Sequence, residues 1–516
     1  MTAPSPSLRA WLRPVLVVGA LRLLYTLLLL VSATLLPAFD TSASHLDHCP
    51  DERLTPTPPK PSWAPLARAI TELNVWDTAH FTHYARCDLQ YEHQAAWFPL
   101  APLLARFLTQ HVPGLAITLG THAALVWSLI IVNVVGAALA AGYAASLARG
   151  VGDRGLGVHI IAGATVLMAF SPAAAHLSGG YTEGLFAGLS NLGVYLVLFG
   201  LGRGDGDGHG SLHYLVHSWT SWWIGVLALA LASAARSNGV VAVGYLGWAG
   251  LTMLFRMLRI AGAGAGEAGA QTRRRRRGRS RMTFLWSWTW CSRSWRYLLQ
   301  IAFTFVGLFG GVCCVLAPFV GLQWLGYRSF CGANQPDPRP WCADAIPSIY
   351  GYIQRTYWGN GFLTNWTSQH TGHWCLAAPM LIFSLLCVYI YAEADPRRFV
   401  TLGLVDLWRH AQGVSSSSSS CKTLQPGTVG SYVLRSDAYA LLDAYWMPFM
   451  LHWLFYVVYA VLFMAPEVTT RFVAVLPVVY WWGAGMGDVG EGVIWAWFLA
   501  YNVAGLVLFP NFYPWT

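Results

Sequence analysis

Residues 74–99 of this sequence, NVWDTAHFTHYARCDLQYEHQAAWFP, gather an unusual number of ionisable side chains. They include Asp77, His80, His83, Asp88, Glu92 and His93. A carboxylate beside imidazoles can transfer protons in catalysis, and the same groups can bind a metal ion. This stretch is therefore the first candidate for a functional site, and both kinds of chemistry have to be considered for it.

Asp77 allows two interpretations. As a general base it would take a proton from a sugar hydroxyl at the edge of a membrane. Alternatively, the run Trp-Asp-Thr-Ala-His-Phe could begin a short helix that Asp77 caps. Residue types alone leave both interpretations open.

The histidines of this stretch could serve a metal or a substrate. His80 and His83 follow Asp77 at helical spacing, but no cysteine or carboxylate cluster completes a metal site, so we predict none. Glu92 and His93 could bind an acceptor or a phosphate. The alternative for both is hydrogen bonding within their own loop.

Polar residues elsewhere could meet an anionic group. Arg86, Arg236 and Arg355 could each bind a phosphate with two parallel hydrogen bonds, or each could be a structural ion-pair partner. The segment SPAAAHLSGGYTEGLFAGLSNL, residues 171–192, contains a Ser-Pro break and a Gly-Gly turn before Glu183. It is either a broken membrane helix whose N-terminus faces an anionic head group, or a tight hairpin with Glu183 stabilising the helix dipole.

Composition identifies the elements that must position these groups. The 516 residues are 55% hydrophobic and 11% charged, with a mean hydropathy of +0.45, whereas a soluble domain carries about 25% charged residues. The chain is therefore an integral membrane protein. Its net charge of +9 does not indicate nucleic-acid binding, because arginines concentrate in residues 273–281, between apolar segments, as in a basic loop at the cytoplasmic membrane face.

Apolar runs long enough to cross a bilayer as helices recur along the chain. The first is too long for a cleaved signal peptide, so we expect it to be retained. Residues 95–111 are apolar but contain Pro99 and Pro102, which favours an interfacial piece. We predict about eleven spans: residues 15–39, 115–148, 158–176, 183–201, 219–235, 240–257, 297–325, 374–392, 444–464, 472–485 and 492–510.

The distribution of basic residues predicts the orientation of these spans. It assigns two large loops, residues 41–114 and 327–373, to the non-cytoplasmic side. It assigns the basic loop 258–296 and the loop 393–443, which contains the serine run 415–420, to the cytoplasm. All of these loops belong to one membrane domain.

Two further features of the large loops agree with this orientation. The sequon at Asn365 falls in the second loop. Cys49 and Cys87 lie in the first loop, and Cys331 and Cys342 lie in the second. Disulfides within each pair are conceivable in an oxidising lumen, although all four cysteines could equally remain thiols.

Seven ordered motifs resemble those of the PIG-V family of mannosyltransferases, from about residue 75 to the end of the chain. The basic loop, the serine run and some spacer lengths depart from the family pattern. The motifs are WDTAHF, YEHQAAWFPLAP, SPAAAHLSGGYTEGLFA, ARSNGVVAVGYL, PWCADAIPSIYGYIQRTYWGNGFL, RFVAVLPVVYW and NFYPWT.

The resemblance implies an all-α GT-C glycosyltransferase fold in the endoplasmic reticulum membrane, with a luminal active site. It implies transfer of the second mannose, in α-1,6 linkage, from dolichyl-phosphate mannose to the glycosylphosphatidylinositol (GPI) precursor, without a cofactor and with a possible small membrane partner. It favours Asp77 as the catalytic base. We expect the substrates to be bound by Trp76, His80, Glu92, His93, Glu183, Arg236, Asn238, Tyr352, Gln354 and Arg355.

Two rival functions are less consistent with the sequence. A transporter or lipid scramblase would place charges inside the spans and show internal repeats, and neither is evident. Another luminal GT-C enzyme that uses a dolichyl-phosphate sugar would share the fold, but the motif PWCADAIPSIYGYIQRTYW argues against it.

Overall fold

The computed structural model describes residues 7–39, 49, 52–151, 155–200, 212–255, 257–258, 285–331, 339–411 and 427–515. Within these ranges the chain is helical, and its only β-pairing is an isolated bridge between Leu434 and Met486. The arginine run at residues 273–281 of the predicted basic loop and the serine run at 415–420 lie outside the described residues, whereas residues 285–296 of that loop belong to helix α12.

Seven helices in the described part of the chain are long and apolar enough to cross a membrane. Three shorter apolar helices, α7 (Val158–Ala169), α9 (Glu183–Gly200) and α10 (Leu212–Ala235), pack among them. The predicted all-α polytopic membrane fold is thus confirmed for the described residues. The seven are α1 (Leu8–Leu35), α6 (Thr121–Gly150), Ser237–Phe255, the Thr304–Phe330 part of α12 (Leu285–Phe330), α14 (Thr371–Ala394), α18 (Met447–Phe463) and α21 (Asp488–Leu508).

The predicted span 472–485 is wrong. The chain forms two short helices there, α19 (Thr469–Val473) and α20 (Pro477–Ala484), and α20 is buried in the core along its whole length. Pro477 lacks the amide proton that a continuous helix would need, so the helix restarts at this residue. Burial in the protein interior, and not contact with lipid, explains the apolar composition of this segment.

The predicted span 158–176 is also divided. Helix α7 ends at Ala169, and a short helix α8 (Ala174–Ser178) follows after Ser171 and Pro172. Proline disfavours a helical conformation for the residue before it, which accounts for the break.

Arg22 of α1 satisfies the carbonyl groups that this break exposes. Its side chain is fully buried, and its guanidinium donates hydrogen bonds to the carbonyl oxygens of Met168 and Ala174, both at 3.1 Å. A third hydrogen bond goes to the carbonyl oxygen of Ala169. Carbonyls at helix ends cost free energy when they are buried without a donor, so Arg22 has a structural reason to lie inside an apolar helix.

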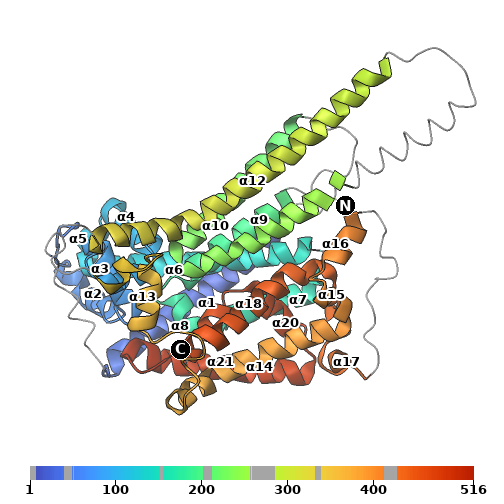
Figure 1. The fold of residues 1–516 in the computed structure, drawn as a ribbon. Coiled ribbons are helices and arrows are strands. Elements are labelled where there is room, and N and C mark those ends of the chain that lie inside the picture. Colours follow the sequence, from blue (N-terminus) through green and yellow to red (C-terminus); the bar gives the residue numbers. More distant parts are fainter. Residues whose placement is uncertain are drawn as a thin grey trace, which may run out of the picture.

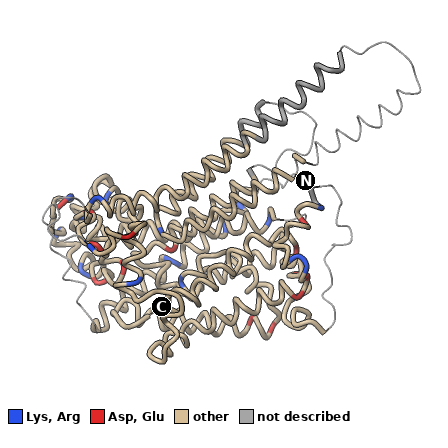
Figure 2. Tube along the Cα trace, in the orientation of Figure 1, with Lys and Arg blue, Asp and Glu red and all other residues tan. Residues whose placement is uncertain are grey.

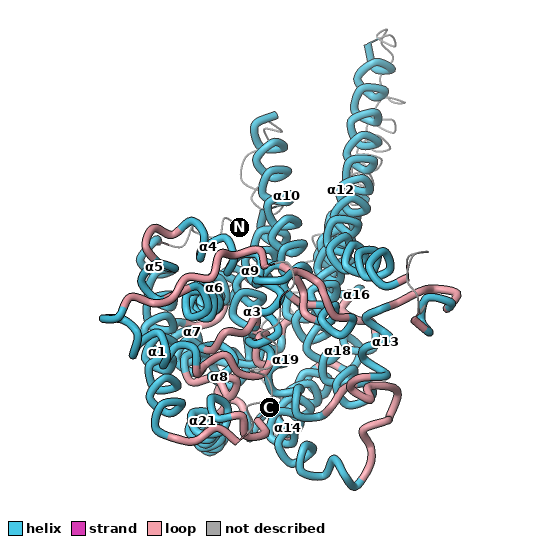
Figure 3. The backbone as a smooth tube through the Cα atoms, turned by 90° about the vertical axis from the view of Figure 1, so that its left-hand side faces the viewer, coloured by secondary structure: helices cyan, strands magenta, loops and turns pink. Residues whose placement is uncertain are grey.

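The predicted loops lie at opposite ends of the long helices (Figures 1 and 3). The elements of loop 41–114 cluster at one end, together with α13 (Ile349–Thr356) of loop 327–373, and α15 (Pro396–Val400), α16 (Leu404–Ala411) and α17 (Val429–Val433) lie at the other. Figure 2 shows charged residues gathered at these two ends, whereas the helices between them are mostly uncharged. The elements of loop 41–114 are η2 (Pro61–Trp63), α2 (Ala64–Thr71), α3 (Asp77–Cys87), η3 (Glu92–Ala96) and α4 (Leu100–His111). The short helix α5 (Leu115–Leu119) follows them, so the span predicted from residue 115 begins as a continuous helix only at Thr121.

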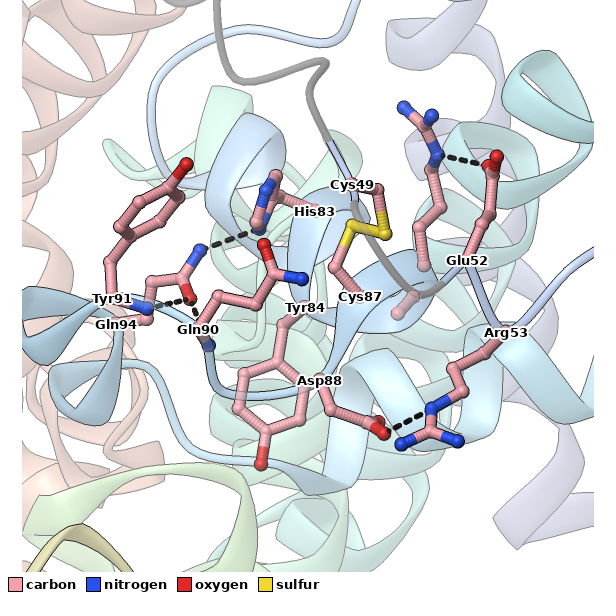
Figure 4. The surroundings of a disulfide bond; sticks show 12 residues. Cys49, Glu52, Arg53, His83, Tyr84, Cys87, Asp88, Gln90, Tyr91 and Gln94 are labelled. Carbon is pink, nitrogen blue, oxygen red and sulfur yellow. Dashed lines mark hydrogen bonds and ion pairs between the residues drawn. A yellow bond between two sulfur atoms is a disulfide. The ribbon is translucent and has the colours of Figure 1, made fainter. Parts of the chain in front are cut away.

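Both conceivable cysteine pairs are disulfides in the structure. Cys49 is bonded to Cys87 at the end of α3, and Cys331 is bonded to Cys342. In Figure 4 the first disulfide fixes the chain before Glu52 against α3, close to the ion pair between Arg53 and Asp88. Each disulfide therefore stabilises one of the two large loops.

The sequon at Asn365 is expected to remain unglycosylated, because Asn365 is only 5% exposed and its side-chain amide nitrogen is buried. Endoglycosidase treatment of the protein from cells should leave its electrophoretic mobility unchanged. As a control, Arg53→Asn creates an Asn-Leu-Thr sequon with Thr55 at a side chain that is 57% exposed. This variant should gain a glycan, whereas a glycan on Asn365 itself would contradict the buried placement.

Candidate active site

Asp77 begins α3 through an unusual backbone conformation. The preceding residue, Trp76, has a φ of 52°, a region in which a bulky residue is strained by about 1–3 kcal/mol. The indole of Trp76 donates a hydrogen bond to the carbonyl oxygen of Phe509 at 3.2 Å and packs against Phe512. The C-terminal segment thus holds Trp76 in place and directs α3.

The structure does not support the helix-cap interpretation of Asp77. Trp76 occupies the N-cap position, and Asp77 is the first helical residue. The carboxylate of Asp77 instead forms an ion pair with Arg471 of α19, with 2.9 Å between Oδ2 and Nη1. The backbone amide of Asp77 donates a hydrogen bond to the hydroxyl oxygen of Tyr181 at 3.3 Å.

Arg471 connects Asp77 to a second carboxylate. Its Nε atom lies 3.9 Å from Oε1 of Glu183, and its guanidinium lies 5.8 Å from the centre of the Tyr181 ring. Burial alone would lower the pKa of Arg471, but the carboxylates of Asp77 and Glu183 raise it above its ordinary value. Arg471 is therefore a permanent positive charge between two carboxylates.

Glu183 is fully buried and also pairs with Arg236. Arg236 donates a hydrogen bond to the hydroxyl of Thr182 at 3.2 Å and lies over the ring of Phe472 at 5.0 Å. Asp77, Arg471, Glu183 and Arg236 form one chain of alternating charges, hereafter the charge network. It balances two negative charges with two positive ones, as low-dielectric surroundings require.

Close backbone packing makes this convergence possible. Asn133 of α6 donates hydrogen bonds to the carbonyl oxygens of His176 and Gly179, at 2.7 and 2.9 Å, and fixes the Gly-Gly turn. A Cβ atom on Gly180 would approach Thr78 of α3 to 2.5 Å. Glycine at this position therefore lets α3 lie directly against the turn that leads to Tyr181 and Glu183.

Sequence reasoning identified three members of the charge network but missed Arg471. Arg471 is the only charged residue between Glu467 and Asp488, and it opens a motif that the family resemblance already includes. A lone charge in such an apolar segment was the available signal, because charges near the membrane are costly unless they are paired. Tyr181 was missed as well.

His80 lies one turn after Asp77 on α3, in an aromatic environment. Its ring stacks on Trp97 with 3.8 Å between ring centres, and His93 lies edge-on at 5.5 Å. Burial lowers the pKa of His80 to about 4, although the charge of Asp77 opposes the shift. Burial also lowers the pKa of His93. Both rings are neutral at physiological pH and can offer hydrogen bonds but no charge.

The other predicted residues of the two loops meet at a seam between the loops. Glu92 accepts a hydrogen bond from the hydroxyl of Tyr357 at 3.0 Å and another from the indole of Trp341. Tyr352 packs against the ring of Tyr357. The contacts of Glu92 thus join the two loops to each other and do not reach the charge network.

Gln354, Arg355 and Asn238 also lie apart from Asp77. The side chain of Gln354 accepts a hydrogen bond from Asn360 at 2.7 Å, and Arg355 is exposed at the end of α13. Asn238 lines an internal cavity of about 20 Å³ that does not include Asp77. Arg86 pairs with Glu52 at 2.9 Å, which matches its structural interpretation.

The charge network can support transfer of a group from a phosphate to a hydroxyl. Asp77 is 26% exposed and Arg471 is 18% exposed, so both reach solvent, whereas Glu183 behind them does not. A carboxylate that can accept a proton therefore lies beside a fixed cation that can stabilise negative charge. Among the described residues no group of three or more His, Cys, Asp or Glu side chains could hold a metal ion.

Comparison with known proteins finds a family of mannosyltransferases. The family described as mannosyltransferase (PIG-V) matches residues 16–261 and 281–516. No solved structure matches the chain.

Individual relatives carry consistent names. GPI alpha-1,6-mannosyltransferase 2 of Cricetulus griseus is 28% identical over 415 residues, covering 80% of this chain and 72% of the relative. The human protein of the same name is 25% identical over 513 residues, which cover 86% of this chain and 87% of the human protein. GPI mannosyltransferase 2 of Drosophila melanogaster is 23% identical over 489 residues, which cover 87% of this chain and 89% of the relative.

The low pKa of His80 predicts a pH-dependent stability. Above about pH 6.5 the residue is neutral in the folded and unfolded chain, and its full contribution to stability is present. As the pH falls from about 6.5 towards 4, the unfolded chain takes up the proton first. The melting temperature of the detergent-solubilised protein should therefore fall over this range.

Replacement of His80 by Phe should reduce this dependence, because Phe keeps the stacking on Trp97 but cannot be protonated. His111→Phe is the matched control, since His111 is exposed and also stacks on an aromatic ring, that of Phe107. The melting temperatures of the unsubstituted protein, His80→Phe and His111→Phe are measured by thermal unfolding between pH 7 and 4. If the melting temperature of His80→Phe fell with pH as steeply as that of the unsubstituted protein, His80 would not be the cause of the pH dependence.

Proposed function

Since this chain belongs to the PIG-V mannosyltransferase family, we propose that it transfers the second mannose, in α-1,6 linkage, to the GPI precursor. The proposed donor is dolichyl-phosphate mannose, and the acceptor is a glycolipid that already ends in mannose. The names of the relatives support the linkage and the pathway. The observation that carries the mechanism is the ion pair between Asp77 and Arg471 at the start of α3.

In the proposed reaction the acceptor hydroxyl attacks the anomeric carbon of the donor mannose. The new carbon–oxygen bond forms as the bond to the phosphate oxygen breaks, on opposite faces of the sugar, so the β-linked donor gives an α-linked product. Asp77 takes the proton of the hydroxyl, and the phosphate oxygen keeps the electron pair of the broken bond. Dolichyl phosphate is a good leaving group, so no general acid is needed.

Arg471 couples these two events electrostatically. When Asp77 accepts the proton it loses its negative charge, and Arg471 loses part of its counter-charge. At the same moment the departing phosphate gains negative charge, which Arg471 and Arg236 can stabilise. Negative charge moves from the carboxylate to the phosphate while the net charge around Arg471 stays constant.

We also propose that the enzyme lies in the endoplasmic reticulum membrane with loops 41–114 and 327–373 in the lumen. The two disulfides in these loops suit an oxidising compartment. In this orientation Asp77 meets two lipid-borne sugars at the luminal edge of the bilayer. The predicted small membrane partner remains a prediction, as do the absence of a cofactor and the direct substrate contacts of the ten residues named from the sequence.

Expression in cells blocked at the second mannose tests the function. The unsubstituted chain should restore GPI-anchored proteins at the cell surface, measured by flow cytometry. Asp77→Asn keeps the size of the side chain but removes the base, so the transfer rate in membranes should fall by about 100-fold or more. Failure of the unsubstituted chain to restore anchors would disprove the proposed function.

Asp437→Asn is the control for this substitution. Asp437 forms an ion pair with Arg435 at 2.8 Å. The pair follows closely after α17, which lies at the end of the molecule opposite α3. Loss of this pair should leave transfer unchanged. Wild-type activity of Asp77→Asn at a normal protein level would rule out Asp77 as the base.

Arg471 should affect the chemical step more than binding. Arg471→Gln should lower kcat by about 100-fold, because it removes a donor to the developing phosphate charge. Arg471→Lys should recover part of this loss, since lysine keeps the positive charge but cannot form bidentate hydrogen bonds. Arg435→Gln is the control, and thermal unfolding of each variant separates lost activity from lost folding. An unchanged kcat for Arg471→Gln would contradict the role of Arg471.

A further inference from the structure

A cavity of about 1,100 Å³ opens next to the segment that leads into α3, and none of the proposed catalytic groups lines it. It lies between the end of α1, the helix α2, the start of α6 and the C-terminal segment around Phe512. This volume is slightly above the range of about 300–1,000 Å³ that small-molecule sites occupy. The cavity therefore has room for a head group of several rings.

The cavity is directly connected to the structure around Asp77. Asn74, three residues before Asp77, lines it. Phe512 also lines it, and the ring of Phe512 packs against Trp76 with 5.6 Å between ring centres. Phe512 thus connects the cavity to Trp76, the residue before Asp77, and a ligand in the cavity would lie near the reacting groups without touching them.

The walls of the cavity differ in chemistry. Ala33 and Leu36 at the end of the membrane helix α1 form an apolar wall, as expected where a lipid enters from the bilayer. Arg68 and Glu72 of α2 line the opposite side. Arg68 is exposed, and its side chain forms no ion pair or hydrogen bond within the described part of the chain, so its guanidinium can bind an anion from solution or lipid.

The position of the cavity discriminates between the two lipid substrates. In dolichyl-phosphate mannose the phosphate is bonded to the carbon that reacts, so it must lie within a few ångströms of Asp77 and beside Arg471. In the acceptor the phosphate is bonded to inositol, and further sugar rings separate it from the reacting hydroxyl. A cation in a cavity that none of the proposed catalytic groups lines therefore suits the acceptor phosphate and not that of the donor.

We propose that this cavity binds the inositol-phosphate end of the acceptor glycolipid, with Arg68 as the phosphate ligand. Glu72 and Asn74 face the same space and can bind sugar hydroxyls. The acceptor glycan then passes Trp76, and its terminal mannose reaches Asp77. This inference rests on the proposed function, because it assigns one substrate of that reaction to a defined part of the structure.

Steady-state kinetics with two synthetic acceptors test the assignment. The first is an inositol phospholipid whose glycan ends in mannose, and the second carries the same glycan on an alkyl inositol without phosphate. For the unsubstituted protein, loss of the acceptor phosphate should raise the acceptor KM about tenfold. Arg68→Gln should raise the KM of the phosphorylated acceptor by a similar factor, leave the KM of dolichyl-phosphate mannose unchanged, and abolish the preference for phosphate.

Lys60→Gln is the matched control, because Lys60 is also an exposed cation near α2 but does not line the cavity. It should leave both acceptor KM values unchanged. A second variant, Ala69→Phe, places a bulky ring in the cavity next to Arg68 and should raise the acceptor KM without changing that of the donor.

The outcomes separate this proposal from the proposed function. If the unsubstituted protein transfers no mannose to either acceptor, the function itself is wrong, and the cavity assignment fails with it. If transfer occurs but Arg68→Gln behaves like Lys60→Gln, only the cavity assignment is overturned. A raised donor KM with an unchanged acceptor KM would instead assign the cavity to the donor phosphate and would also overturn the proposal.

Discussion

The buried carboxylate of Glu183 is the constraint on which the rest of the site depends. A fully buried negative charge is tolerated only if cations neutralise it, and two arginines approach it from different parts of the chain. Arg236 comes from the end of α10, and Arg471 comes from the short helix α19. Because Arg471 also pairs with Asp77, satisfying Glu183 fixes the position of the carboxylate that we propose as the base.

This arrangement requires membrane helices that are interrupted. Tyr181 and Glu183 can face α3 only because the chain breaks after α7 and turns at Gly179 and Gly180. Arg22 and Asn133 satisfy the carbonyl groups that these interruptions leave in the interior. The polar groups inside the apolar helices therefore have a common purpose, since they maintain the irregular backbone that positions the charge network.

Hydropathy alone predicted most of the fold, because spans in contact with lipid must be long and apolar. It failed at residues 472–485, where the same composition arises from burial among other helices and Pro477 ends the continuity. The site was harder to predict. Asp77, Glu183 and Arg236 were identified by residue type and motif, but nothing in the sequence shows that Arg471 lies 2.9 Å from Asp77. Such a contact depends on how α3 and α19 pack, and the two residues are 394 positions apart in the sequence.

The balance of charges in the network also explains why a bilayer-edge site suits this chemistry. Two carboxylates and two arginines give no net charge, so the empty site needs no counter-ions from water. A phosphate that enters from the lipid brings a negative charge, and the arginines can respond to it only as Asp77 becomes protonated. In surroundings of low dielectric constant the attraction between the arginines and these negative charges is stronger than in water. In the proposed reaction the network would therefore stabilise negative charge as it moves from the Asp77 carboxylate to the departing phosphate.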